Sequence, residues 1–91
     1  MKHATPVALD ALEPLLAALR GIDGLTERKR GVFYRRSQAA LHFHEDPAGF
    51  FADVRLGPGW VRLPVNTVHE RRSLLAELKA ELAATERRVR K

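Results

Sequence analysis

The chain contains no cysteine. That absence excludes disulfides, thiolate zinc sites and a cysteine nucleophile, so a metal ion would have to be bound by histidine, aspartate or glutamate. Long apolar runs are also missing, because no window approaches the roughly 18 apolar residues of a membrane span and residues 1–6 lack the apolar stretch of a signal peptide. We therefore expect a cytoplasmic protein that makes no membrane contact.

Composition places the chain among ordinary globular proteins. Its 91 residues are 45% hydrophobic and 30% charged, which predicts a single small domain over residues 1–91 with a core over about residues 6–85. The net charge is +5, and the basic tail formed by residues 86–91 holds four basic residues and one acidic residue. This concentration at one end argues against nucleic acid as a partner, although binding through the tail and the strand arginines remains an alternative.

Four leucines predict an N-terminal helix, because their spacing places them on one stripe: Leu12, Leu15, Leu16 and Leu19. Two starting points fit. Thr5 can cap a helix that Pro14 then kinks, or Asp10 can cap a later helix that holds Pro14 in its first turn. In both cases we expect the helix to end at Gly21 as a left-handed C-cap.

From Gly24 onward the apolar period changes to two, which predicts an antiparallel meander of four or five strands. We place these strands at residues 25–29, 32–36, 39–45, 50–56 and 60–65. Thr67 and Glu70 then form a capping box for a second helix that runs to about Thr85. Both helices carry one apolar stripe, so we expect a two-layer α+β sandwich with the two helices on the same face of the sheet.

The segment 41–46 contains the residues that could carry chemistry. Strand alternation points one set of side chains toward the helices and the other set, which includes both histidines, away from them. The inward set is Ala39, Leu41 and Phe43, and the outward set is Ala40, His42 and His44.

The register of this strand against the next one follows from the loop between them. Residues 46–49 form a four-residue loop, so Glu45 should lie opposite Phe50. Counting back places His44 opposite Phe51, His42 opposite Asp53, and Ala40 opposite Arg55. The outer face would then present two imidazoles, a carboxylate, an arginine and a phenyl ring in one patch.

This outer patch supports several hypotheses. His42, His44 and Asp53 are the ligand types of a facial site for a divalent metal, and a histidine opposite an aspartate can also act as a general base. The simpler interpretation is a polar sheet face in which Asp53 pairs with Arg55 or His42. Phe51 is a large apolar side chain on this face, which favours a contact surface for a homodimer or another protein.

Four other residues are conspicuous, and for each of them a structural role or simple exposure is the first interpretation. Trp60 either caps the edge of the core or stacks on a ligand of the outer patch. Tyr34 is expected to face outward with Phe33 inward. His3 lies in a terminus that we expect to be mobile, and His69 is expected to be exposed in the first turn of the second helix.

Several short motifs lie between about residues 21 and 82: His42-Phe43-His44, Gly49, Asp53 and Gly59-Trp60-Val61. In these motifs the chain resembles a small bacterial family of luciferase-like or luciferase-associated domains of unknown function. Leu41 stands where the family has glycine, and the family's histidine-containing insert is reduced here to residues 55–58. The resemblance implies the strand register derived above and no particular activity, since the domain is unlike a catalytic barrel.

The sequence is consistent with three functions. The leading hypothesis is a non-enzymatic, self-associating interaction domain with no catalytic residues, which binds through the outer face. Its binding residues would be His42, His44, Phe51, Asp53, Arg55 and Trp60. The alternatives are a metal-assisted enzyme at His42, His44 and Asp53, and nucleic-acid binding.

Overall fold

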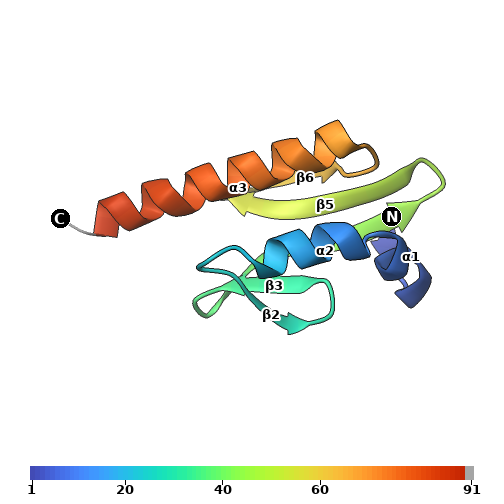
Figure 1. The fold of residues 1–91 in the computed structure, drawn as a ribbon, viewed down its shortest axis with the longest axis horizontal. Helices are drawn as coiled ribbons and strands as arrows, with labels where there is room; N and C mark the ends of the chain where they lie inside the picture. Colours follow the sequence, from blue (N-terminus) through green and yellow to red (C-terminus); the bar gives the residue numbers. More distant parts are fainter. Residues whose placement is uncertain (90–91) are drawn as a thin grey trace.

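The protein forms an antiparallel sheet with helices at both ends of the chain (Figure 1). The structure is a computed structural model that describes residues 1–89, with side chains described for residues 1–85. Two helices follow the first strand and one helix closes the chain: α1 (Pro6–Ala11), α2 (Glu13–Arg20) and α3 (Val68–Val89). The strands are β1 (Lys2–His3), β2 (Thr26–Lys29), β3 (Val32–Arg35), β4 (Gln38–Asp46), β5 (Gly49–Leu56) and β6 (Gly59–Pro64).

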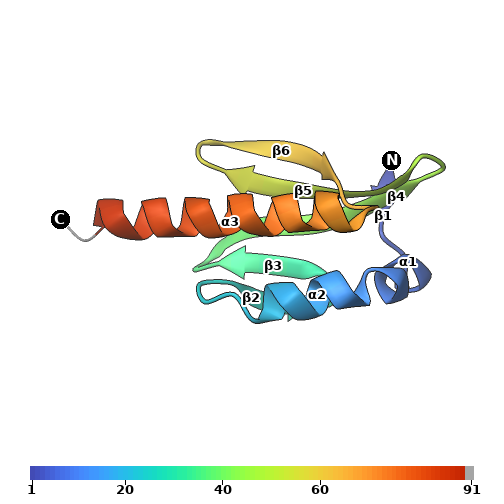
Figure 2. The ribbon, with the colours of Figure 1, turned by 45° about the horizontal axis from the view of Figure 1, so that its top comes forward.

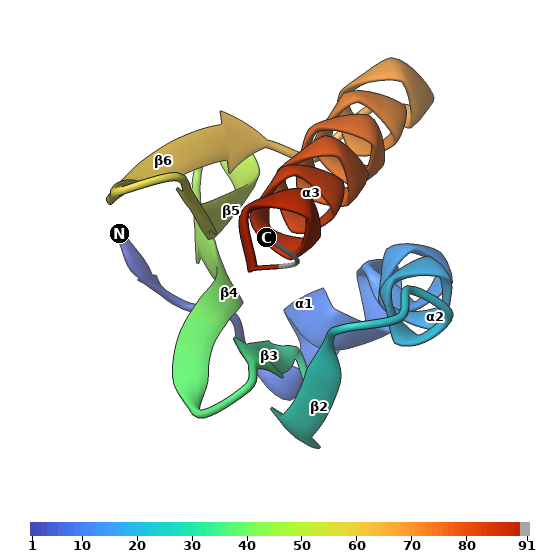
Figure 3. The same ribbon diagram turned by 90° about the vertical axis from the view of Figure 1, so that its left-hand side faces the viewer.

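The sheet confirms the predicted meander and adds one strand to it. Strands β2 to β6 are hydrogen-bonded in sequence order, and all pairings are antiparallel. The sheet curves, and α2 and α3 lie on the same side of it (Figures 2 and 3). The two-layer α+β prediction is therefore correct.

Strand β1 was not predicted. It has two residues, too few to produce a periodic pattern, yet it pairs with β4 through Lys2 opposite Glu45 and His3 opposite His44. Strand β3 pairs with the earlier half of β4, up to Leu41. One edge of β4 is thus shared between β3 and β1.

The N-terminal helical segment starts at Thr5, the first of the two predicted alternatives. The Thr5 hydroxyl accepts a hydrogen bond from the Ala8 amide at 3.3 Å, and Pro6 occupies the first turn. The segment then breaks at Leu12, so Pro14 falls in the first turn of a separate helix, where it costs no hydrogen bond. Gly21 does cap α2, but its φ of −84° is right-handed, so the predicted left-handed cap is wrong.

The core lies between the helices and the inner face of the sheet. Leu41 and Phe43 are buried as predicted, and Ala52 and Val54 on β5 are buried beside them. Ala40 was predicted to face outward and is 6% exposed. This prediction is wrong because the β3–β4 register shifts by one residue between the pairs at Leu41 and Ala39, which forms a bulge at this end of β4.

Helix α3 begins with the predicted capping box. The Thr67 hydroxyl accepts from the Glu70 amide at 3.0 Å, and the Glu70 carboxylate accepts from the Thr67 amide at 3.0 Å. The helix continues to Val89, so the predicted end at Thr85 and the start of the basic tail at residue 86 are too early. Residues 90 and 91 of that tail lie outside the described residues. Within residues 1–89, no helix has the length and apolar character needed to cross a membrane.

Candidate metal centre

The predicted register of β4 against β5 is correct around the histidines. His44 lies opposite Phe51, His42 lies opposite Asp53, and Glu45 lies opposite Phe50. These pairs bring both histidines and the carboxylate to the outer face. The register was predictable because each strand buries one face, and a slip of one residue would expose the inward set.

His3 joins the two predicted histidines. Strand β1 places His3 opposite His44, with ring centroids 4.7 Å apart, while the His42 ring lies 4.9 Å from that of His44 and 5.8 Å from that of His3. One nitrogen from each of the three rings lies within 4.8 Å of the other two. The expectation that His3 lies apart from the site in a mobile terminus is therefore wrong.

Two nitrogens of this cluster are buried without a partner. His44 is buried, with 9% of its side chain exposed; its Nδ1 has no hydrogen-bond partner within the described structure, whereas its Nε2 faces the Asp53 carboxylate at 3.0 Å. Nδ1 of His42 is also buried without a partner there. Buried polar atoms in native proteins nearly always have a partner, and a metal ion or a bound water would satisfy the two Nδ1 atoms.

Asp53 lies behind His44 and carries a negative charge. Its Oδ1 accepts from Arg62 Nε at 2.6 Å, and its Oδ2 accepts from Arg62 Nη2 at 2.8 Å, so Asp53 is bonded to Arg62 rather than to Arg55 or His42. The Arg62 guanidinium keeps the pKa of Asp53 below its ordinary value. Oδ2 also lies 3.0 Å from His44 Nε2.

This arrangement favours one tautomer of His44. A small rotation of the ring would let Nε2–H donate to Asp53, which leaves Nδ1 with a free lone pair. Histidine ligands of metals commonly donate their other ring N–H to a carboxylate in this way. Asp53 thus suits the role of an orienting group behind His44, and His3 takes the third ligand position.

The three imidazoles fit a divalent transition metal. Imidazole suits zinc, copper and nickel, and three histidines form a known type of zinc site. The nitrogens of a tetrahedral zinc site lie about 3.4 Å apart, so zinc would draw the rings together by small rotations from their present separation. Zinc needs neutral imidazoles, and burial, followed by the nearby charge of His44, lowers the pKa of His42 and favours its neutral form.

The remaining residues predicted for this face surround the cluster. Trp60 is 43% exposed on the outer face, its ring lies 5.3 Å from that of His42, and Arg55 stacks over it at 4.7 Å. The interpretation of Trp60 as a cap on the core edge is therefore wrong. Arg55 was predicted to lie opposite Ala40, but the β4–β5 ladder ends at the pair of Leu41 and Val54. Arg55 donates to the Ala39 carbonyl at 3.2 Å. Phe51 is half-buried.

Residues outside this face behave as the sequence predicted. Phe33 is fully buried in the core, and Tyr34 packs under the Arg28 guanidinium at 4.4 Å. His69 is exposed in the first turn of α3 and is not part of the cluster.

No family model, curated protein or solved structure matches this chain. The resemblance to luciferase-like domains accordingly remains a prediction. The features of the structure that bear on function are the three imidazoles, the Asp53 carboxylate behind them and the surfaces around them.

The pKa of His42 predicts how the stability of the metal-free protein depends on pH. Because the folded pKa lies below the unfolded value of about 6.5, the free energy of unfolding should be at its full value above that pH and should decrease as the pH falls toward the folded pKa. Urea unfolding between pH 7.5 and 5 should show this decrease, and His42→Gln should reduce it. An NMR titration that placed the pKa of His42 at or above about 6.5 would contradict the expectation.

Proposed function

We propose that this protein is a metal-binding domain that holds one divalent transition-metal ion, with zinc as the best match, on His3, His42 and His44. The proposal rests on the three imidazoles, which come together from β1 and β4. The Nδ1 atoms of His42 and His44 are buried and have no partner within the described structure. The carboxylate of Asp53 behind His44 supports it.

The number of protein ligands indicates what such an ion could do. Structural zinc sites usually have four protein ligands, whereas catalytic sites have three and leave one position for water or substrate. The cluster contributes three protein ligands, and His3 is the ligand that is exposed to solvent. A metal-assisted reaction at that open position is therefore the second candidate function, with the ion supplying Lewis-acid chemistry and Asp53 holding the orientation of His44.

The interaction-domain hypothesis has less support than the metal site. It was motivated by Phe51 as an apolar side chain on an open face, and Phe51 is half-buried. Trp60, on the edge strand β6, is an exposed apolar side chain that contacts the site. Self-association through this edge is a separate proposal that the metal site does not require.

Zinc titration of the untagged, metal-stripped protein tests the proposed function. Calorimetry should give one zinc ion per chain, and imidazole NMR signals of His3, His42 and His44 should shift together while those of His69 stay in place. The reason is that His69 lies outside the cluster and serves as an internal control. Absence of binding heat, or shifts confined to His69, would overturn the proposal.

A further inference from the structure

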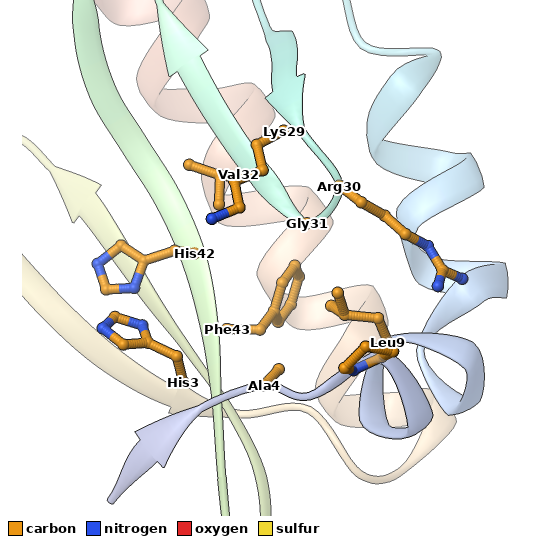
Figure 4. A pocket seen from close by; sticks show the side chains of 10 residues that line it. His3, Ala4, Leu9, Lys29, Arg30, Gly31, Val32, His42 and Phe43 are labelled. Atoms are coloured by element: carbon orange, nitrogen blue, oxygen red, sulfur yellow. The ribbon is translucent and has the colours of Figure 1, made fainter.

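A cavity of about 640 Å³ opens beside His3 and His42 of the candidate metal centre (Figure 4). It lies at the shared edge of β4, where the pairing with β3 reaches Leu41 and the pairing with β1 begins at His44. His42 and Phe43 fall between the two ladders and line the cavity, together with His3. The volume is within the range of about 300 to 1,000 Å³ that is typical of small-molecule sites.

The walls of this cavity have two kinds of chemistry. Leu9, Val32 and Phe43 form an apolar surface, while His3 and His42 form the wall that adjoins the candidate metal centre. Figure 4 shows the histidine rings on one side of the cavity and Leu9 on the other. A ligand in this cavity could therefore bury an apolar body and still place a polar group beside the metal.

Two basic residues, Lys29 and Arg30, also line the cavity. They differ in whether an acidic side chain already pairs with them. Arg30 donates to Asp10 at 2.9 Å and to Glu13 at 2.8 Å, so its charge is neutralised. Lys29 is exposed and forms no ion pair with the side chains that the structure describes, and in Figure 4 it extends toward the histidine side of the cavity. A free ammonium group beside an apolar cavity favours a ligand with an anionic group.

The cavity wall formed by the β2–β3 turn is held in place by packing. Gly31 has a φ of +80°, which favours glycine, and a Cβ at this position would lie 2.7 Å from Leu9 Cδ2, so the turn packs closely on α1. The Gly31 amide also donates to Glu27 at 2.9 Å. These two contacts hold this wall of the cavity against α1 and β2.

We propose that this cavity binds a small carboxylic acid with an apolar body. The apolar body packs on Leu9, Val32 and Phe43, and the carboxylate lies between the Lys29 ammonium and the open position of the metal. The metal contact depends on the proposed function, whereas the apolar surface and Lys29 do not. Carboxylate oxygens are common zinc ligands, and the ammonium–carboxylate contact is a charge-assisted hydrogen bond.

Three probes separate the parts of this proposal. Octanoate has both the apolar body and the charge, 1-octanol lacks the charge, and acetate lacks the body. With zinc-loaded protein, octanoate should shift the backbone amide NMR signals of Val32 and Phe43. It should bind at least tenfold more tightly than either of the other probes, because 1-octanol loses one charge-assisted contact and acetate loses the apolar surface. Equal binding of octanoate and 1-octanol, or shifts that do not include these residues, would overturn the proposal.

A matched pair of variants tests the role of Lys29. Lys29→Met keeps the apolar stem and removes the charge, and it should weaken octanoate binding roughly tenfold. Lys79→Met makes the same change at an exposed position on α3 and should leave the affinity unchanged. Equal affinities for the two variants would refute the role of Lys29.

Metal-free protein distinguishes the failure of this inference from the failure of the proposed function. If zinc binds at the histidines but octanoate does not bind in the cavity, the cavity proposal is wrong and the metal site stands. If zinc does not bind, the metal site is wrong, and octanoate binding that still depends on Lys29 would support the cavity alone.

Discussion

Replacement of His44 by alanine should weaken zinc binding more than any other single substitution. His44 is the buried member of the cluster, its ring lies within 5 Å of both other rings, and Asp53 orients it. If three ligands share a binding free energy of about 10 kcal/mol, the loss of one costs about 3 kcal/mol, which is on the order of a 100-fold loss of affinity. Calorimetric zinc titration of His44→Ala against the wild type measures the effect.

Two further variants keep this result interpretable. His69→Ala removes a histidine outside the cluster and should bind zinc as the wild type does. His3→Ala removes an exposed ligand and should also lose affinity, while the circular dichroism spectrum of the metal-free protein stays unchanged. If His44→Ala perturbs the fold, His3→Ala still tests whether the histidines bind zinc. Wild-type zinc affinity in both His44→Ala and His3→Ala would refute the assignment.

Replacement of Glu45 by alanine should also weaken zinc binding strongly, although Glu45 is not a ligand. Its Oε2 accepts hydrogen bonds from the Thr5 amide and the Thr5 hydroxyl, both at 2.9 Å, and its Oε1 lies 3.6 Å from Lys2 Nζ. These contacts hold the two-residue strand β1, which positions His3. Without them β1 should detach from β4, and zinc affinity should fall at least tenfold, toward that of His3→Ala, as is typical when a group that orients a ligand is lost.

Glu45→Gln is the matched control for this prediction. The glutamine side chain keeps an oxygen that can accept from Thr5, so its zinc affinity should stay close to that of the wild type. A double variant with Glu45→Ala and His3→Ala should bind no more weakly than His3→Ala, because both changes remove the same ligand. Additive losses in the double variant would mean that Glu45 acts on zinc by another route.

Strand periodicity explains how much of the site could be predicted. His42, His44 and Asp53 lie on strands with a clear alternation of apolar and polar residues, so their face and their register against one another followed from the sequence. The prediction of an outer-face histidine patch depended on no tertiary information beyond one loop length. The capping box at Thr67 was local in the same way.

The features that were not predicted depend on contacts between residues distant in the sequence. His3 belongs to a strand of two residues that is held by Glu45. Glu45 binds Thr5, which lies 40 residues away in the sequence, and no local pattern predicts such a contact. Thr5 as the helix cap was the one available signal, since it places His3 just ahead of an ordered element. The partner of Asp53 was also missed, because Arg62 becomes its neighbour only through the β5–β6 register.

The most direct test of the metal site is anomalous diffraction at the zinc edge from crystals of the untagged protein grown with zinc. We predict a single strong peak about 2.1 Å from one nitrogen each of His3, His42 and His44, with Nδ1 as the ligand atom of His44. A peak only at His69, or no peak between the three rings, would contradict the account.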